Sequence, residues 1–479
     1  MPTREHAIAL LLLASTCLHG CAGRNAGAES DERPERTVLS TVYDDARVGE
    51  RADADLSAQI GLYDDPALVD YVAEVGRRMV QHTARRPFEY RFQIVDQAAP
   101  NAFALPGGFV YVSRGLLALV SDEHELANVI AHEITHASHR HAAAQQEMAR
   151  RQNPLQMPIL RMAKLAAYGR AQENDADRGG QQTAAAAGYD PAAMPHFLQR
   201  LGDLERLRGD SRLPSYLDTH PGTTERVSTT TLYATQLEAT TRLRSEPDRE
   251  GYLRRVDGIT FGPNPAEGVF RGDRFLHPKL GFQMRFPPGW VTRNDHQAVG
   301  ASSPDGNAVV FLRAEGPAGD PQAFAAAFVA KHQSRFQLEI VRNTPIQIGG
   351  IAAWRVAARG RVNGRRLLGQ LTFVPHDGLM YRITAVAPER IANDYVAQAR
   401  NAARSFHPLP AAARSGFEVM RLRFTRARSG ESIPALIQRT DSALRPGAIA
   451  LINGVFANHR FTGGEWVKFV ALEPYPAGS

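Results

Sequence analysis

The chain has 479 residues, of which 43% are hydrophobic and 22% are charged, and its formal net charge is +6. This length and apolar content predict two to four folded domains and exclude a disordered chain. The positive charge comes almost entirely from arginines that are interspersed with acidic residues, so we expect no nucleic-acid partner.

The N-terminus has the pattern of an export signal. Arg4 precedes an apolar run over residues 7–18 that is short for a membrane-spanning helix, and the run closes on Cys21. The pattern over residues 1–21 resembles a bacterial lipoprotein signal, which implies a lipid anchor at Cys21 and a periplasmic location, at the outer membrane. His19 is unusual in such a signal, and an ordinary cleaved signal peptide is the alternative.

The next segments predict a tether and then a mainly helical domain. Residues 22–40 are polar and rich in Gly and Pro, as in a flexible tether. Residues 66–82 carry apolar side chains at helical spacing, and residues 90–95 alternate as a strand. A Gly pair within residues 101–112 predicts a hairpin or an edge strand. That strand either packs on the core or binds a peptide by strand addition.

Two histidines four residues apart, His132 and His136, are the strongest chemical signal in the chain. On a helix, both imidazoles point the same way and can bind one Zn²⁺, with Glu133 beside them. The segment predicts a helix, because its apolar residues recur at helical spacing and Asp122 and Glu125 form a capped start. Zinc lowers the pKa of bound water to ~7, and a neighbouring carboxylate can take its proton.

A catalytic zinc site needs a third protein ligand, with the fourth position open to water. We predict Glu173 as this ligand. Asp177 shares its helix face and can accept a hydrogen bond from a ligand imidazole. His139 and His141 follow the histidine pair, and we interpret them as solvated or supporting residues rather than ligands.

These motifs together resemble a known family. The resemblance rests on His132-Glu-x-x-His136, Glu173-x-x-x-Asp177, Asn101-Ala-Phe-Ala-Leu-Pro-Gly-Gly, Ala187-Gly-Tyr-Asp-Pro and Thr219-His-Pro. Over roughly residues 40–242 the chain is similar to the periplasmic BepA-type zinc metalloproteases, relatives of HtpX and the CAAX prenyl protease. The resemblance implies a gluzincin fold, Glu133 as general base, and His132, His136 and Glu173 as zinc ligands. It also implies a role in degrading or assisting envelope proteins.

His220 is a further candidate for the site. It precedes Pro221, which disfavours helix, so its imidazole is expected on a loop. In the resembling family, a His-Pro at this place can approach the zinc. Three roles stay open: a fourth ligand that silences the enzyme, a donor to the oxyanion during turnover, or no role in the site.

Two further regions follow the domain predicted over residues 41–242. Residues 243–272 read as a linker rich in Gly, Pro and charge. Residues 273–409 predict an α+β accessory domain, with a helix near 321–336 and hairpins at Asn363-Gly364 and Asp377-Gly378. This domain is similar to PsbP/Mog-like units.

Residues 415–479 resemble a diverged LysM module with strand-helix-helix-strand order. Such modules bind peptidoglycan-type glycans, which makes peptidoglycan a possible partner. A structural packing domain is the equal alternative.

The sequence therefore predicts an α+β multidomain protein: a mainly helical gluzincin protease domain with a small edge sheet, then the accessory and LysM-like domains. The leading hypothesis is a metalloendopeptidase with one Zn²⁺ per chain that cleaves unfolded or misassembled envelope proteins. The alternative is a chaperone-like assembly factor, or binding protein, with a silent zinc site. A wall-tethering module led by the C-terminal segment is a third class.

Overall fold

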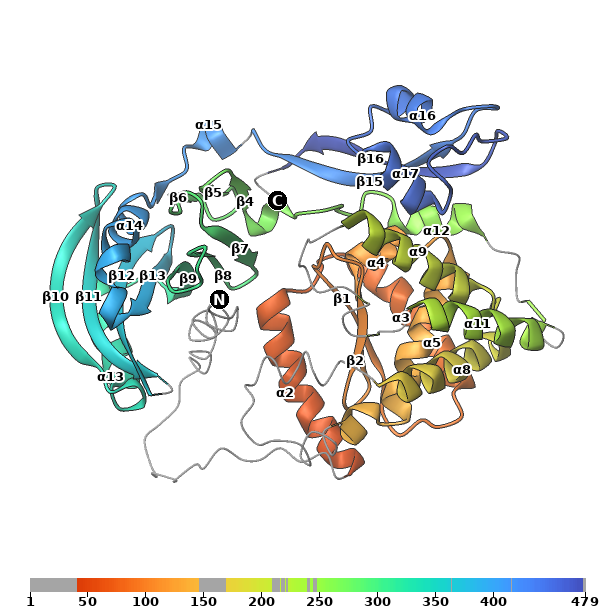
Figure 1. The fold of residues 1–479 in the computed structure, drawn as a ribbon, viewed down its shortest axis with the longest axis horizontal. Coiled ribbons are helices and arrows are strands. Elements are labelled where there is room, and N and C mark those ends of the chain that lie inside the picture. Colours follow the sequence, from red (N-terminus) through yellow and green to blue (C-terminus); the bar gives the residue numbers. More distant parts are fainter. Residues whose placement is uncertain are drawn as a thin grey trace. The chain divides into compact units, whose positions relative to one another are not determined.

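The computed structural model describes residues 41–145, 169–208, 216, 220, 223–238, 242–243, 248–362, 364–414 and 416–476. The predicted signal with its Cys21 and the predicted tether lie outside these residues. The described residues form two compact units, one made of residues up to 263 with 419–473, the other of 264–418 with 474–476 (Figure 1). Among the residues described, no helix has both the length and the apolarity to span a bilayer.

The first unit is mainly helical, as predicted for residues 41–242. Its helices are α2 (Val42–Ile60), α3 (Pro66–His82), α4 (Arg114–Leu119), α5 (Glu123–Ser138), α8 (Arg170–Ala186), α9 (Ala193–Arg208), α11 (Thr223–Glu238) and α12 (Arg249–Val256). Its small sheet has the order β1-β3-β2, with β1 at Arg91–Val95, β2 at Ala102–Leu105 and β3 at Phe109–Ser113. The predicted Gly pair, Gly107 and Gly108, turns the β2–β3 hairpin with φ of 85° and 89°, which glycine adopts readily. β1 and β2 are the two edge strands of this sheet.

Helix α5 is the buried centre of this unit. It begins at Glu123 because the Asp122 side chain accepts a hydrogen bond from the backbone N–H of Glu125 at 3.1 Å, as the sequence predicts. Every residue from His124 to Ser138 is buried, and α3, α8, α9 and β2 surround the helix. A helix buried all round has little freedom to shift. The side chains it carries toward the site are therefore held in fixed positions.

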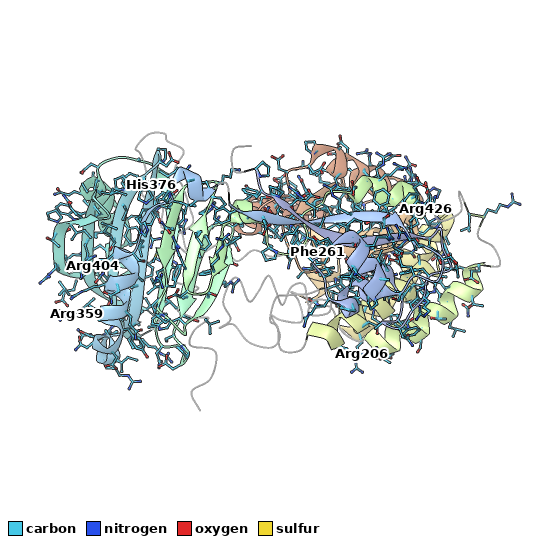
Figure 2. All side chains as sticks on the ribbon, turned by 90° about the horizontal axis from the view of Figure 1, so that it is seen from above. Arg206, Phe261, Arg359, His376, Arg404 and Arg426 are labelled. Atoms are coloured by element: carbon cyan, nitrogen blue, oxygen red, sulfur yellow. The ribbon has the colours of Figure 1, made fainter. Side chains whose placement is uncertain are left out.

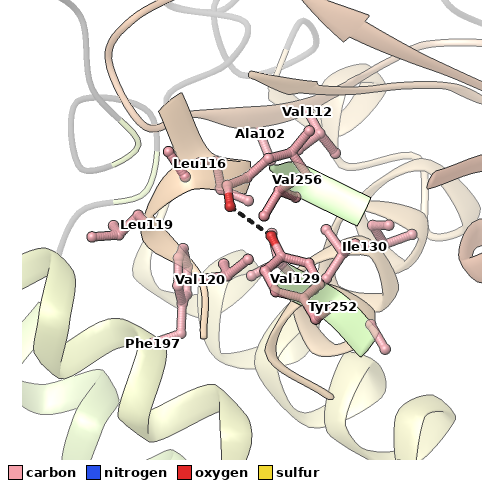
Figure 3. Close-up of a cluster of buried hydrophobic side chains, with 14 of the residues drawn as sticks. Ala102, Val112, Leu116, Leu119, Val120, Val129, Ile130, Phe197, Tyr252 and Val256 are labelled. Carbon is pink, nitrogen blue, oxygen red and sulfur yellow. Dashed lines mark hydrogen bonds between the residues drawn. The ribbon is translucent and has the colours of Figure 1, made fainter. Parts of the chain in front are cut away.

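The segment predicted as a linker contributes to the core. Its helix α12 buries Tyr252, Leu253 and Val256. Tyr252 donates its hydroxyl hydrogen to the Leu117 carbonyl at 2.6 Å, and its ring lies among the apolar side chains shown in Figure 3. No helical period is visible in this segment of the sequence, because its few apolar residues are surrounded by charged ones.

Residues 419–473 pack in the first unit rather than apart from it. The order β15 (Glu418–Arg426), α16 (Ile433–Thr440), α17 (Pro446–Asn453) and β16 (Trp466–Pro474) is the predicted strand-helix-helix-strand. Lys468 on β16 is fully buried, and its Nζ donates to the carbonyls of Ala118, Leu119 and Val120 at 2.8, 3.0 and 2.9 Å. These carbonyls at the end of α4 lack helical partners, so the ammonium group acts as a cap.

The second unit is a sheet covered by helices on both faces. Its main sheet has the order β10-β11-β12-β13-β9-β8-β7, and a smaller one has the order β14-β6-β5-β4. The elements are β4 (Val269–Arg271), β5 (Arg274–His277), β6 (Phe282–Arg285), β7 (Val291–Asp295), β8 (Ala298–Ser302), β9 (Val309–Pro317), α13 (Pro321–Phe336), β10 (Glu339–Ile348), β11 (Ile351–Val362), β12 (Arg365–His376), β13 (Leu379–Pro388), α14 (Asn393–Arg404), β14 (His407–Pro408) and α15 (Ala411–Arg414). The predicted α13, β11, β12 and β13 are confirmed, whereas β7 to β10 were not predicted.

Candidate metal centre

Helix α5 brings the two predicted histidine ligands together. The Nε2 atoms of His132 and His136 lie 2.9 Å apart, and both side chains are almost completely buried. Glu133, the next residue on the helix, is fully buried as well. The i, i+4 spacing therefore produces a pair of imidazoles aimed at one point, as the sequence predicts.

Helix α8 places Glu173 because a glycine pair lets it approach α5 closely. A Cβ atom at Gly180 would lie 2.8 Å from the backbone nitrogen of His132, closer than real Cβ contacts. The absence of a side chain there allows the two helices to pack at short range. As a result, the Glu173 carboxylate lies 3.7 Å from Nε2 of His132 and 3.5 Å from Nε2 of His136.

His220 also reaches this site. Its Nδ1 lies 3.1 Å from each carboxylate oxygen of Glu173 and 3.4 Å from Nε2 of His132. Its other nitrogen, Nε2, lies 3.4 Å from Oε1 of Glu133. The ring is stacked on Tyr216, with ring centroids 4.2 Å apart, and is fully buried. The structure thus places His220 between the general-base candidate and the third-ligand candidate.

Arg226 holds the acidic residues of the site, a role that sequence reasoning missed. Its guanidinium donates two hydrogen bonds of 2.7 Å to Asp177, and its Nη1 lies 2.8 Å from Glu173. Asp177 lies 3.0 Å from Nδ1 of His132, where it can accept that proton. Burial alone would raise the pKa of Asp177, but Arg226 outweighs it and lowers the pKa to about 2. Asp177 is therefore a permanent carboxylate that can fix the tautomer of His132.

A second carboxylate, that of Asp175, is linked to His136 through the ring of His141. Nδ1 of His136 lies 2.8 Å from Nδ1 of His141, and Nε2 of His141 lies 3.1 Å from Asp175. When His136 uses Nε2 toward the site, its Nδ1 carries the proton and His141 accepts it. His141 then donates to Asp175 through Nε2. His141 is buried and supports the ligand candidate His136, whereas His139 is partly exposed and contacts Asp175 and the ring of His141 but not His136.

The backbone at the end of α5 aims His141 back at the site. Arg140 has φ of 55°, a left-handed conformation that non-glycine residues rarely adopt. Its guanidinium forms an ion pair with the buried Asp45 of α2, with Nη2–Oδ1 at 2.8 Å. This pair holds the turn that follows the helix. Helix α2 thereby contributes to the position of His141.

The protonation states of His136 and Glu133 favour metal binding and proton transfer. Burial and the neighbouring His132 lower the pKa of His136 well below its usual range, so the ring is neutral and can offer a lone pair. Burial raises the pKa of Glu133, and His220 and His132 reduce that rise. In the described part of the chain, neither carboxylate oxygen of Glu133 accepts a hydrogen bond. Such a group is suited to exchange a proton with a bound molecule.

Comparison with known proteins identifies this domain. Residues 66–165 and 155–232 match the model of peptidase family M48, and these ranges contain all the site residues described above except Asp45 of α2. We refer to residues 66–232 as the M48 domain, after the family model that matches them. The whole chain is longer than the M48 domain, whose matched ranges end at residue 232.

Relatives of the M48 domain include named proteases. The chain is 34% identical over 209 residues to the beta-barrel assembly-enhancing protease of Yersinia pestis, covering 38% of this chain and 42% of that protein. It is 33% identical over 158 residues to the mitochondrial metalloendopeptidase OMA1 of Homo sapiens, covering 28% and 30%. The chain thus spans less than half the length of either relative.

The likeness to solved structures is weak. The solution structure of cyanobacterial PsbP from Synechocystis sp. PCC 6803 matches 29% of this chain and 95% of that chain, at 14% identity and a TM-score of 0.24. This score is too low to assign a fold. The PsbP/Mog-like and LysM-like descriptions therefore stay predictions.

The donor set of the M48 domain fits a zinc ion. One ligand atom from each of His132, His136, Glu173 and His220 lies within 4.8 Å of the others, and all four side chains are buried. Imidazole nitrogens with a carboxylate oxygen are the ligands that Zn²⁺ prefers in hydrolytic sites. The unsatisfied carboxylate of Glu133 beside this set gives the cluster the character of a catalytic centre rather than of a purely structural one.

We expect His141→Ala to weaken zinc binding by ~10- to 100-fold, because it removes the acceptor that fixes the tautomer of His136. Zinc affinity is measured by competition with a chelating dye. His139→Ala is the matched control, since it removes a histidine that contacts Asp175 but no ligand, and its zinc affinity should stay at the wild-type value. Equal losses in the two variants would contradict a specific effect of His141.

Proposed function

We propose that the protein is a zinc-dependent endopeptidase of the bacterial cell envelope that cleaves unfolded or misassembled envelope proteins. The observation that carries the proposal is the buried donor set of His132, His136 and Glu173 with the unsatisfied carboxylate of Glu133 beside it. The envelope location is supported by the relatives named as beta-barrel assembly-enhancing proteases. The lipid anchor at Cys21 is part of the proposal.

His132, His136 and Glu173 would hold the zinc ion. When bound, zinc polarises a carbonyl group and increases the acidity of water. Glu133 takes the proton from the attacking water at its carboxylate and delivers it to the leaving amine. Asp177 and His141 keep the two ligand imidazoles in the tautomers that leave Nε2 free. Arg226 keeps Glu173 and Asp177 charged and in place.

The edge strand β2 is the element that we propose to hold the substrate. It pairs with β3 on one side, and it packs beside α5, which carries the histidine pair. Ala104 of β2 already has an interaction partner, so an extended peptide would pair along β2 in its place, through main-chain hydrogen bonds that do not depend on side-chain identity. This mode of binding suits unfolded chains. Folded proteins do not offer an extended segment.

The test of this function compares unfolded and folded substrates. We expect the purified protein to cleave casein and a denatured outer-membrane protein, and to leave the folded form of the same membrane protein intact. Suppression of substrate aggregation without any cleavage would instead support the alternative, a chaperone-like assembly factor with a silent site. The contacts of residues 419–473 with the first unit favour the packing role for this segment, and glycan binding stays a prediction.

His220 is the residue that would silence the site. Its presence in the donor set gives four protein ligands, a closed arrangement that is typical of zinc sites without an open position for water. We therefore propose that activity requires His220 to leave. A closed site also accounts for how a broad protease spares its own compartment.

We expect His220→Ala to raise basal casein cleavage, because the substitution removes the occupant of the water position. If about a tenth of the molecules are open at any time, the rate rises roughly tenfold. The control is His196→Ala, which changes an exposed histidine on α9 and should leave the rate unchanged. A fall of ~10²-fold or more would assign His220 to oxyanion stabilisation instead, and an unchanged rate would remove it from the site.

A further inference from the structure

The second unit contains a cavity of about 530 Å³ between α14 and one face of the main sheet. Strands β9 to β13 contribute to its wall, and on β11 the lining residues Arg355 and Ala357 alternate along the strand. The residues between them, such as Val356 and Ala358, face the opposite side of the sheet. There they pack with apolar side chains of α13, such as Ala325 and Phe328, in what we call the α13 cluster. A volume of this size is typical of small-molecule sites.

Four arginines line this cavity: Arg342 on β10, Arg355 on β11, and Arg400 and Arg404 on α14. None of the residues described as lining it is Asp or Glu, and none of the four guanidinium groups has a carboxylate partner in the described part of the chain. Figure 2 labels Arg404 and, for comparison, Arg359, which lies outside the cavity and forms ion pairs with Glu339 and Glu389.

Arg355 is the member of this set that requires an explanation. Its side chain is half-buried, and its Nε donates to the Thr372 hydroxyl at 3.4 Å. Burial and the charges of Arg404 and Arg400 lower its pKa, so its surroundings oppose the positive charge. By contrast, the buried Arg382 of the same unit contacts Glu315 at 2.8 Å. A partly desolvated cation among like charges is stable when an anion joins it.

Most of the remaining wall of the cavity is apolar, and its polar residues are Thr344, Gln370, Asn393 and Tyr395. Val310, Ile346, Leu368 and Val396 line it, together with Trp290. A small inorganic anion would satisfy the arginines but leave this surface in contact with water. A ligand that has both an anionic group and an apolar body matches the whole lining.

We propose that this cavity binds a single-chain, lipid-like amphiphile whose head group is a carboxylate or a phosphate. The head group lies among the four arginines, since a planar guanidinium forms paired hydrogen bonds with either oxyanion. The chain lies against Val310, Ile346, Leu368 and Trp290. This site is independent of the metal centre and of the proposed proteolysis, and it gives the accessory domain a function of its own.

The test measures binding of dodecyl phosphate and of laurate to the full-length protein, below their micelle-forming concentrations. Trp290 is one of the chain's three tryptophans and lines the cavity, whereas Trp354 packs with the α13 cluster and Trp466 belongs to the other unit. We expect a saturable change in tryptophan fluorescence, with one site per chain, that Trp290→Phe abolishes. Dodecanol, which lacks the charge, and inorganic phosphate, which lacks the chain, should bind at least about tenfold more weakly.

Variants of one strand separate the site from general charge effects. Arg355→Gln should weaken dodecyl phosphate binding at least tenfold, and Arg355→Lys should restore part of it. Arg361→Gln, on the same strand but exposed and outside the cavity, should bind like the wild type. Equal losses in Arg355→Gln and Arg361→Gln, binding of dodecanol as tight as that of dodecyl phosphate, or a fluorescence change that persists in Trp290→Phe would each overturn the proposal.

Discussion

Glu133→Gln is expected to retain one zinc ion per chain and to lose casein cleavage by at least ~10²-fold. The amide has nearly the shape of the carboxylate, so the buried position can accept it. It cannot take a proton from water, however, and proton transfer by a positioned group contributes ~10²- to 10⁴-fold. The measurement is the initial rate of casein cleavage together with the zinc content of the same preparation.

The matched control is Glu205→Gln, which changes an exposed glutamate on α9 in the same way. Its rate should equal that of the wild type. If Glu133→Gln cleaves casein at the control rate, Glu133 is not the general base. If Glu133→Gln loses its zinc as well, its role is to hold the centre and not to transfer protons.

Glu173→Ala is expected to lose stoichiometric zinc and, with it, all proteolysis. The substitution removes the only carboxylate of the described donor set, whose other members are all histidines. It also leaves Arg226 with Asp177 alone and places a positive charge beside the empty position. We therefore expect a loss of zinc affinity greater than the ~10- to 100-fold that follows when a supporting residue is removed.

Asp177→Asn is the comparison variant for this experiment. It keeps a hydrogen-bond acceptor for His132 and for Arg226 but removes the charge of the carboxylate, and it should retain zinc with an affinity reduced by ~10- to 100-fold. Asp177→Ala is less suitable, since removing one partner of a buried ion pair destabilises a protein by about 3–5 kcal/mol. If Glu173→Ala binds zinc as tightly as the wild type, the third ligand is His220 and not Glu173.

The sequence predicted the parts of the site that local geometry determines. His132, Glu133 and His136 lie within five residues of one helix, so their helical spacing alone places them together. Glu173 and Asp177 also share a helix face, but only their combination with the first motif distinguished them from a solvated acidic surface. His220 entered through a resemblance. Its position near Glu173 required the structure.

Residues whose role arises from tertiary contacts could not be predicted. Arg226 follows a run of Thr and Glu without any motif, and only the packing of α11 beside α8 brings it to Glu173 and Asp177. Lys468 lies among Trp466, Val467 and Phe469, a pattern that predicts a lysine on the exposed face of a strand. In the structure it is fully buried, because the ends of α4 offer it three carbonyl groups.

The structure of the accessory domain could also be predicted only in part. Its hairpin at Asp377-Gly378 was predicted because that dipeptide has a specific backbone preference, and both residues have positive φ. Strand β10 was missed because nearly all its side chains are exposed, so the sequence lacks the alternation of a half-buried strand. The arginine cavity depends on strands and a helix that are far apart in the chain.

We propose that proteolysis requires one zinc ion in this donor set, and this dependence can be measured. It is tested most directly by removing all metal with a chelator, returning Zn²⁺ in steps, and measuring zinc per chain and casein cleavage on the same samples. We predict that the stripped protein is inactive and that cleavage rises with bound zinc and reaches its maximum at one ion per chain. Full cleavage by the zinc-free protein would contradict the account.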